Sequence, residues 1–277
     1  MERAVNLPTR LDYPIIAVGD LHGRCDWLTK LVTKLRQHPV WPHAKLAFLG
    51  DLVDRGPNVR ETVQLVMDLL AEKPGSTCVA GNHDWALVRA AGLNGPPSER
   101  WQKHYRDRYD HYRTFESYLG TGFPIGRNGW TANLELLKGA MPAEHREFLA
   151  ELPWVAESDG HVFVHNGLSP YLDEPAEVQL ELLRRKRWDG YVTPKLGSGT
   201  HLHYNPEYPV WLGADKTLSK HTIPAPGRVI VSGHVRVDEP DVNPIRIRID
   251  TSGGIDPPLT ACILTSPSSQ PEFVFSE

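Results

Sequence analysis

Five apolar segments of this 277-residue chain each end in a short loop that carries Asp, Asn or His. The first three segments are residues 15–18, 46–49 and 78–80, and a stretch with apolar residues at helical spacing follows each of them. A continuous apolar run, a glycine-containing loop and then a helix are typical of a buried parallel strand and its crossover. The repeated order predicts an α/β fold with right-handed crossovers.

The rest of the chain departs from this order in two places. Residues 92–160 contain aromatic side chains at nearly helical spacing, so we expect a helical insertion over the sheet. These aromatic residues either pack inward between ordinary helices or help to shape a substrate pocket. After two more apolar runs, at 162–164 and 229–231, the segments 245–250 and 259–264 resemble a meander. Apolar and basic residues alternate in the first of these two segments, which predicts one solvent-exposed face.

Charge and cysteine content exclude several classes of partner. The chain has 30 Lys and Arg against 34 Asp and Glu, a net charge of −4, so we expect neither a nucleic-acid nor a membrane partner. Its three cysteines are too few and too scattered for a disulfide framework, which favours a reducing compartment and a cytoplasmic protein. The first apolar run is also too short for a signal peptide or a membrane span.

Side chains with useful chemistry gather in the five loops. In open α/β sheets the carboxyl ends of the strands face one crevice, so we expect the loops to converge. Carboxylate, imidazole and carboxamide groups brought together in this way suit divalent metal ions better than an organic ligand. The residues, in loop order, are Asp20 and His22, Asp51 and Asp54, Asn82 and His83, His165, and His234.

Each of these residues also has a simpler explanation when it is taken alone. Asp20 could cap a helix, and the segment from Asp51 to Arg55 could be a turn with an Asp–Arg pair. Asn82 tolerates positive φ in a loop, and a histidine such as His165 often makes only structural hydrogen bonds. Five strand ends that each carry a ligand-type residue favour one shared site over these separate explanations.

The loops also carry motifs. They are GDLHG at 19–23, GDLVDRG at 50–56, GNHD at 81–84, HNG at 165–167 and GH at 233–234. In this order the motifs resemble those of the calcineurin-like metallophosphoesterase superfamily, and the second resembles its phosphoprotein phosphatase branch of bacterial and phage-like serine/threonine phosphatases. The Asp at the end of GNHD instead resembles the residue at this position in symmetrical diadenosine tetraphosphatases. Those enzymes, however, typically lack the second Asp of the second motif, which is Asp54 here.

The resemblance implies an αββα sandwich, in which helices flank two mixed β-sheets. The chain would form a single calcineurin-like domain over 1–277, with the helical insertion at about 92–160. The resemblance also implies two divalent metal ions, for which Mn²⁺ is our expectation and Fe or Zn the alternatives. The first metal would be held by Asp20, His22 and Asp51, and the second by Asp51, Asn82, His165 and His234.

The same resemblance assigns catalytic roles. A hydroxide activated by both metals would attack phosphorus in line, without a phosphoenzyme. His83 would protonate the leaving group, and Asp54 would orient His83. Arg55 would hold the phosphate oxygens, with Asn82 as a further substrate-binding residue.

Two further segments have less definite roles. The basic run 184–187 contains Arg185 and Arg187, of which Arg187 is our candidate for a second phosphate-binding arginine, although such a run is by default a solvated helix face. The segment 193–212 contains histidine and aromatic residues that are more typical of packing or surface positions than of a site. They are His201, His203, Tyr204 and Trp211.

The predicted function is a metal-dependent phosphomonoesterase of the serine/threonine phosphatase type, acting on a phosphorylated protein or a small phosphoester. A symmetrical dinucleoside tetraphosphate or polyphosphate hydrolase is the first alternative, since it would use the same metals on a phosphoanhydride. A non-catalytic scaffold of the same fold is the second alternative, although a scaffold has no need of the full ligand set together with His83.

Overall fold

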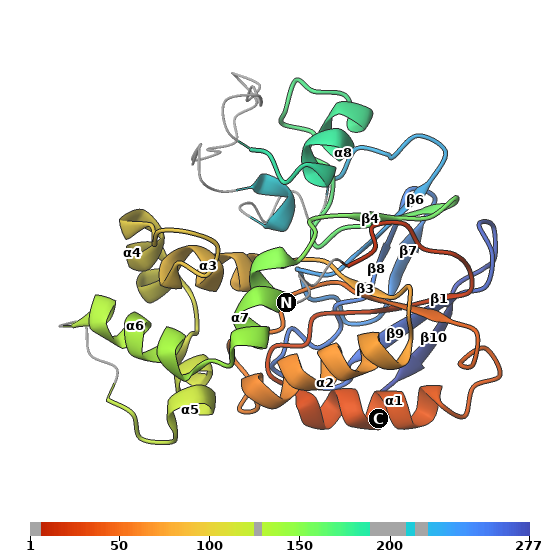
Figure 1. Ribbon diagram of the computed structural model, residues 1–277. Helices are drawn as coiled ribbons and strands as arrows, with labels where there is room; N and C mark the ends of the chain where they lie inside the picture. The colour runs from red at the N-terminus through yellow and green to blue at the C-terminus, as the bar shows by residue number, and fades with distance from the viewer. Residues whose placement is uncertain (1–6, 125–128, 189–208, 214–220) are drawn as a thin grey trace.

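Two five-stranded sheets form the centre of the molecule (Figure 1). The computed structural model describes residues 7–124, 129–188, 209–213 and 221–277. In each sheet three strands pair in parallel and two further strands pair antiparallel to a neighbour, and the eight α-helices found in the described residues flank the two sheets. The predicted α/β fold with two mixed sheets and flanking helices is therefore confirmed. None of the described helices is both long enough and apolar enough to cross a membrane.

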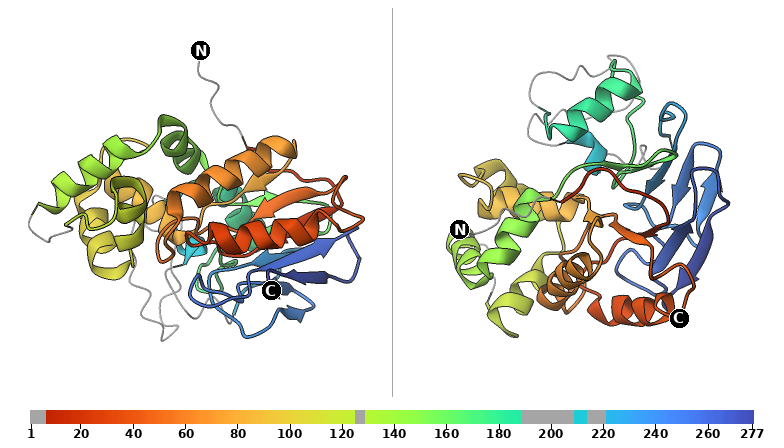
Figure 2. Two further views of the ribbon diagram at one scale, coloured as in Figure 1. Left: turned by 90° about the horizontal axis from the view of Figure 1, so that it is seen from below. Right: turned by 45° about the vertical axis from the view of Figure 1, so that its right-hand side comes forward.

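The first sheet contains the three strands that the opening apolar runs predict. These strands are parallel because a helix returns the chain across the sheet after each of the first two. The helices are α1 (Cys25–Leu35) and α2 (Val59–Glu72), which lie side by side in both views (Figures 1 and 2). The strands, in spatial order, are β10 (Glu272–Phe275), β9 (Thr260–Leu264), β1 (Ile15–Val18), β2 (Lys45–Phe48) and β3 (Thr77–Cys78).

The second sheet is also mixed, but its strands are arranged differently. Its three inner strands are parallel and its two edge strands are antiparallel to their neighbours. Helix α8 (Ala176–Arg184) is joined to the edge strand β4 by an ion pair between Arg184 and Glu157. The strands, in spatial order, are β4 (Ala156–Glu157), β5 (His161–Phe163), β6 (Val229–Ser232), β8 (Arg246–Arg248) and β7 (Asp241–Asn243).

The packing of the strands explains why their sequences are continuously apolar. Ile15 and Ala17 belong to a buried cluster shared by the two sheets, which includes Phe163 of β5. Ile16 and Val18 point the other way and pack in the cluster that contains the helices. Because successive side chains of a strand face opposite sides, a strand covered on both faces needs apolar residues at every position.

Four helices follow α3 (Asn82–Ala91) in the region predicted as an insertion, and we call these helices and the described residues between them the helical segment. They gather with α3 at one side of the sheets (Figures 1 and 2). Of their aromatic residues, Trp101, Tyr105 and Phe115 are buried, whereas Tyr109 is only half-buried. The single-domain organisation over 1–277 stays a prediction. The helices are α4 (Glu99–Arg108), α5 (Tyr112–Leu119), α6 (Trp130–Ala140) and α7 (Ala143–Glu151).

The predicted meander at the end of the chain is wrong. Strand β8 pairs in parallel with β6 in the second sheet, whereas β9 pairs with β1 in the first. The predicted solvent-exposed face of β8 is wrong at Arg246, which is only 2% exposed, whereas Arg248 on the same face is half-buried. The guanidinium of Arg246 donates to Oγ of Ser232 at 2.8 Å and to the carbonyl oxygen of Asn166, so hydrogen bonds replace the water that the alternating pattern implied.

Candidate active site

The loops that follow five strands bring the predicted residues together at one edge of the two sheets. All of the side chains are buried except that of His234, which is half-buried. The convergence follows from the parallel order of the strands, whose carboxyl ends share an edge. The positions are Asp20 and His22 after β1, Asp51 and Asp54 after β2, Asn82 and His83 after β3, His165 after β5, and His234 after β6.

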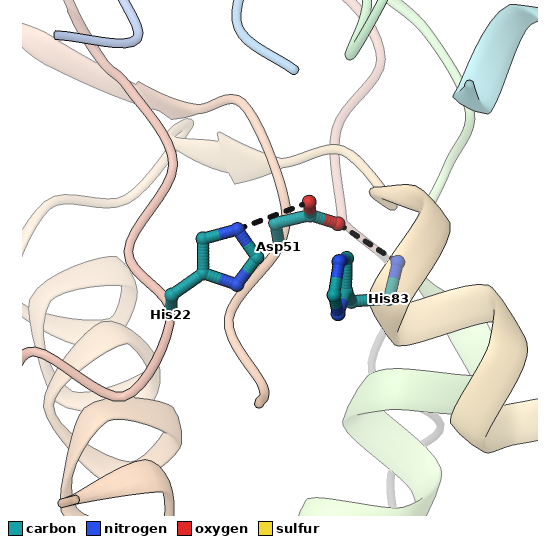
Figure 3. A group of neighbouring side chains, drawn as sticks. All are labelled: His22, Asp51 and His83. Carbon is teal, nitrogen blue, oxygen red and sulfur yellow. Dashed lines mark hydrogen bonds and ion pairs between the residues drawn. The ribbon is translucent and has the colours of Figure 1, made fainter. Parts of the chain in front are cut away.

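Asp51 lies at the centre of this group. Its Oδ2 is 3.3 Å from Nε2 of His22 and 3.4 Å from Nε2 of His165. Its Oδ1 accepts a hydrogen bond of 2.9 Å from the backbone nitrogen of His83, so Asp51 lies between His22 and His83 (Figure 3). A Cβ atom at Gly81 would lie 2.1 Å from Oδ1 of Asp51, so only glycine allows the third loop to approach this closely.

Asn82 and Asp20 connect the loops of the two sheets. Oδ1 of Asn82 is 3.0 Å from Nε2 of His165 and 2.9 Å from Nδ1 of His234. Oδ2 of Asp20 accepts a hydrogen bond of 3.0 Å from the backbone nitrogen of His234, and its Oδ1 is 3.9 Å from Nδ1 of His165. The residues predicted to bind two metals therefore form one continuous cluster, which we call the ligand cluster.

Two groups of side chains in the described residues are close enough to hold a metal ion. They are His22, Asp51 and His83, and Asp51, His165 and His234, with the ligand atoms of each group within 4.8 Å of one another. The first group thus contains His83 where we predicted Asp20. Because Nδ1 of His83 is 2.7 Å from Oδ2 of Asp54, that nitrogen already has a partner outside the ligand cluster.

The hydrogen bonds of His22 leave a nitrogen lone pair for a metal, and its Nδ1 is anchored in the same way as that of His165. Nδ1 of His22 is 2.9 Å from the carbonyl oxygen of Val53, and Nδ1 of His165 is 2.7 Å from that of Leu49. A carbonyl oxygen only accepts hydrogen bonds, so each Nδ1 carries a proton. Nε2 of His22 is buried and lacks a hydrogen-bond partner in the part of the chain that the structure describes. An anchored Nδ1 with an open Nε2 is the arrangement of a metal-binding histidine.

Buried carboxylates crowd the same cluster. Burial and the neighbouring Asp250 raise the pKa of Asp20 well above its usual range. Burial also raises the pKa of Asp250, whose Oδ2 finds no hydrogen-bond partner among the described residues. Burial opposes ionisation of Asp51 as well, but the surrounding histidines lower its pKa well below the usual range. Crowded buried carboxylates of this kind fit cations, whose charge would offset the burial of theirs.

Strained backbone marks the same loops. Six non-glycine residues in the described ranges have positive φ, and five of them are predicted site residues. Each such conformation costs on the order of 1–3 kcal/mol and persists only where the surroundings impose it. The five residues are His22 (42°), Asp51 (51°), Asp54 (70°), Arg55 (62°) and His234 (73°).

His83, Asp54 and Arg55 form a second group beside the ligand cluster. Because Oδ2 of Asp54 accepts the 2.7 Å hydrogen bond from His83, Nδ1 of His83 carries the proton. Nη2 of Arg55 is 3.3 Å from Nε2 of His83, and its Nη1 donates to the carbonyl oxygen of Gly253 at 2.5 Å. The residues predicted as acid, orienting carboxylate and phosphate-binding arginine are thus side by side.

The structure places Arg187 in a pocket of about 280 Å³ beside α8, which Glu177 and Glu181 also line. Its role as a second phosphate-binding arginine stays a prediction. From the segment 193–212, Trp211 is described: it is buried, and its Nε1 donates to Gln179 at 2.8 Å, as expected of a packing residue. His201, His203 and Tyr204 lie outside the described residues.

Three buried residues to which the sequence analysis gave no role in the site also contact it. Asp84 accepts hydrogen bonds of 2.9 Å from the backbone nitrogens of Gly81 and of the loop after β2, so it ties two of the loops together. Tyr105 and Thr114 of the helical segment donate to Asp54. Asp84 has a sequence signal, because an acidic residue three positions after a helix N-cap is typical of a capping box.

Comparison with known proteins identifies a family and several relatives. A model of the family described as calcineurin-like phosphoesterase matches residues 13–238. A symmetrical bis(5'-nucleosyl)-tetraphosphatase of Janthinobacterium sp. (strain Marseille) is 29% identical over 188 residues, which cover 66% of this chain and 56% of that protein. An asymmetrical bis(5'-nucleosyl)-tetraphosphatase of Geobacillus sp. (strain WCH70) is 40% identical over 78 residues, 26% of this chain and 31% of that protein. The chain thus spans about a third to just over half of the length of these two curated relatives.

Solved structures show the same fold at low sequence identity. A protein provisionally named as a diadenosine tetraphosphatase has a TM-score of 0.54 at 20% identity, covering 97% of this chain and 98% of its own. A cold-active protein-tyrosine phosphatase of a psychrophilic Shewanella sp. has a TM-score of 0.55 at 17% identity, covering 98% of this chain and 83% of its own. At this level of identity the likeness concerns the fold alone.

Proposed function

Because this chain belongs to the calcineurin-like phosphoesterase family, we propose that it is a metal-dependent hydrolase of phosphomonoesters, of the serine/threonine phosphatase type. One observation carries the proposal: a cluster of buried ligand atoms adjoins a histidine that is hydrogen-bonded to a buried carboxylate and to an arginine. The first part suits cations, and the second suits proton transfer and phosphate binding. Hydrolysis of an alkyl phosphate needs both.

The chain would hold two divalent cations, and the open Nε2 of His22 fits such a role. We propose Mn²⁺, with Fe or Zn as alternatives, because imidazole and carboxylate ligands accept all three. When bound, the pair would act as Lewis acids and lower the pKa of water near phosphorus. Asp20, His22 and Asp51 would hold one cation, and Asp51, Asn82, His165 and His234 the other, with Asp51 shared.

The residues beside the ligand cluster would act on the substrate. Arg55 would exchange its hydrogen bonds to His83 and Gly253 for the phosphate oxygens, and its planar guanidinium can hold two of them. Asn82 directs Oδ1 to two histidines, which leaves its amide NH₂ group for the phosphate. Once Arg55 has moved to the phosphate, His83 would carry a second proton on Nε2 and donate it to the leaving oxygen, while Asp54 holds Nδ1.

Hydrolysis of dinucleoside tetraphosphates is a second candidate, and the names of the curated relatives favour it. The two candidates make different demands on His83. A phosphoanhydride releases a nucleotide whose phosphate needs little protonation, whereas an alkyl phosphate releases an alkoxide that needs a proton. The hydrogen-bonded pair of His83 and Asp54 therefore favours the phosphomonoester.

A substrate panel separates these candidates. The purified chain, reconstituted with Mn²⁺, would be assayed on a phosphoserine peptide, glycerol 2-phosphate, p-nitrophenyl phosphate and diadenosine tetraphosphate. We expect the highest kcat/KM on a phosphomonoester. A higher value on diadenosine tetraphosphate would replace the first candidate by the second. Two bound metals per chain without turnover of any substrate would point to a non-catalytic scaffold.

A further inference from the structure

The side chain of Asp54 is held by the helical segment as well as by its own loop. Its Oδ1 accepts hydrogen bonds from the hydroxyl groups of Tyr105 in α4 and Thr114 in α5, each at 2.6 Å. Its Oδ2 accepts from Nδ1 of His83 at 2.7 Å. Asp54 is fully buried, and so are both hydroxyl-bearing residues.

This division of partners fixes the orientation of the carboxylate. A carboxylate can rotate about its Cβ–Cγ bond and can offer either oxygen to a neighbour. Two hydroxyl donors on Oδ1 make one rotation favourable, and in that rotation Oδ2 faces His83. Burial, followed by the charge of Asp54, raises the pKa of Tyr105 well above its usual range, so its hydroxyl stays a donor.

The helical segment also holds the strained backbone of this loop. Oγ1 of Thr114 accepts a hydrogen bond of 3.0 Å from the backbone nitrogen of Asp54, besides donating to its side chain. The backbone nitrogen of Arg55 donates to the carbonyl oxygen of Asp110 at 3.1 Å. Since Asp54 and Arg55 both have positive φ, these contacts supply the external support that such conformations require.

The ring of His83 is confined on two sides. It makes edge-to-face contacts with His22 and with Tyr109 of the helical segment, each with ring centroids 4.7 Å apart. A ring held between two others, and bonded through Nδ1 to a fixed carboxylate, presents Nε2 in one direction. The helical segment, together with His22, therefore restricts the direction in which the predicted acid points.

We propose that Tyr105 and Thr114 are positioning residues for the leaving-group side of the site, acting through Asp54 on His83. The proposal rests on the proposed function, since it concerns the proton that a phosphomonoester needs at its leaving oxygen. It gives the helical segment a role in the reaction beyond packing. Both hydroxyls bond to Asp54, which lies outside the ligand cluster, so the effect should appear in proton donation and not in metal content.

The test compares two tyrosines of the helical segment. Tyr105→Phe removes the hydroxyl that bonds to Asp54, and Tyr118→Phe removes one that bonds to His145, with an O–N distance of 2.9 Å. Both tyrosines are buried. We expect Tyr105→Phe to lower kcat on glycerol 2-phosphate by roughly 10-fold or more, in the range of supporting residues of metal sites. Its kcat on p-nitrophenyl phosphate, both KM values and the bound metal should stay near wild type, and Tyr118→Phe should change none of them.

A pair of variants at Thr114 separates orientation from folding. Thr114→Val keeps the shape but removes both hydrogen bonds to Asp54, whereas Thr114→Ser keeps the hydroxyl. We expect the valine variant to show the same leaving-group-dependent loss and the serine variant to recover most of it. Equal losses on both substrates for Tyr105→Phe and Thr114→Val, or no loss, would overturn the proposal.

A measurement without turnover keeps the proposal testable if the proposed function fails. In metal-free protein, ¹⁵N-resolved NMR of the imidazole groups would report the Nδ1–H of His83, which we expect to be protected from exchange. Tyr105→Phe should accelerate its exchange or shift it, and Tyr118→Phe should not. Absence of phosphomonoesterase activity in wild type with an altered His83 signal would reject the function but keep the positioning role; an unaltered signal would reject the positioning role.

Discussion

Asp51 and Asp54 lie three residues apart in one loop, and both are buried with positive φ, yet they have different surroundings. Asp51 meets imidazole nitrogens from loops of both sheets. Asp54 meets two hydroxyl groups from the helical segment and the ring of His83. One carboxylate is thus placed among groups that can bind metal, and the other among groups that orient a proton donor.

The difference shows that the two halves of the site have separate structural origins. The ligand cluster follows from strand order, because parallel strands bring their following loops to one edge. The group around Asp54 depends instead on how helices outside the sheets pack against one loop. A change in the helical segment can therefore alter the leaving-group side while the ligand cluster keeps its geometry.

The largest expected effect comes from Asp51→Asn. Asparagine keeps the shape but removes the charge and one anionic oxygen shared by His22 and His165. We expect bound metal to fall below two per chain and kcat to fall by more than ~100-fold, the upper range for residues that only support a ligand. Metal analysis and assays on p-nitrophenyl phosphate would measure both. Asp68→Asn, on the exposed side of α2, is the matched control. Unchanged metal content would remove Asp51 from the shared position.

His83→Asn tests the other half of the comparison. We expect kcat on glycerol 2-phosphate to fall by roughly 10²- to 10⁴-fold, the usual contribution of a general acid, with a much smaller loss on p-nitrophenyl phosphate. The bound metal should stay at the wild-type level, because Nδ1 of His83 is engaged with Asp54. Equal losses on both substrates would rule out the acid role, and loss of metal would place His83 among the ligands.

The ligand cluster could be predicted from the sequence because its residues occur in short motifs tied to strand ends. Asp20 and His22 follow an apolar run directly, and so does Asp51, so topology alone brings them together. The fold class was predictable for the same reason. Distances and hydrogen bonds, such as that from His22 to Val53, depend on loop backbone conformations that no spacing rule fixes.

The second half could be predicted only in part. The two motifs that contain Asp54 and His83 were evident in the sequence. Tyr105 and Thr114, however, lie in helices whose aromatic spacing also fits ordinary packing. The burial of Arg246 was missed for a related reason. Alternation along a strand predicts a solvent-exposed face, yet the hydrogen bonds that the guanidinium donates to Ser232 and to a backbone carbonyl oxygen can replace water around it.

The smallest expected effect comes from comparing a histidine in β5 with one in the loop that follows this strand. His161 begins β5, and burial lowers its pKa to about 4. His165 follows the same strand; burial alone would lower its pKa too, but Asp51 and Asp20 raise it to about 10. Both histidines are buried, so the neighbouring carboxylates explain why the pKa of the histidine in the ligand cluster is raised and that of the other is lowered.

For His161 the sign of the pH effect follows from its lowered pKa. Between about pH 6.5 and 4, His161 is protonated in the unfolded chain, where its pKa is near 6.5, but stays neutral in the folded chain. The free energy of unfolding therefore falls as the pH falls through this range. We expect His161→Gln to remove at most about 2 kcal/mol of the wild-type decrease between pH 6.5 and 4.5, measured by urea denaturation. Identical pH dependence in the two proteins would mean that burial does not lower the pKa of His161. The contrast with His165 would then no longer hold.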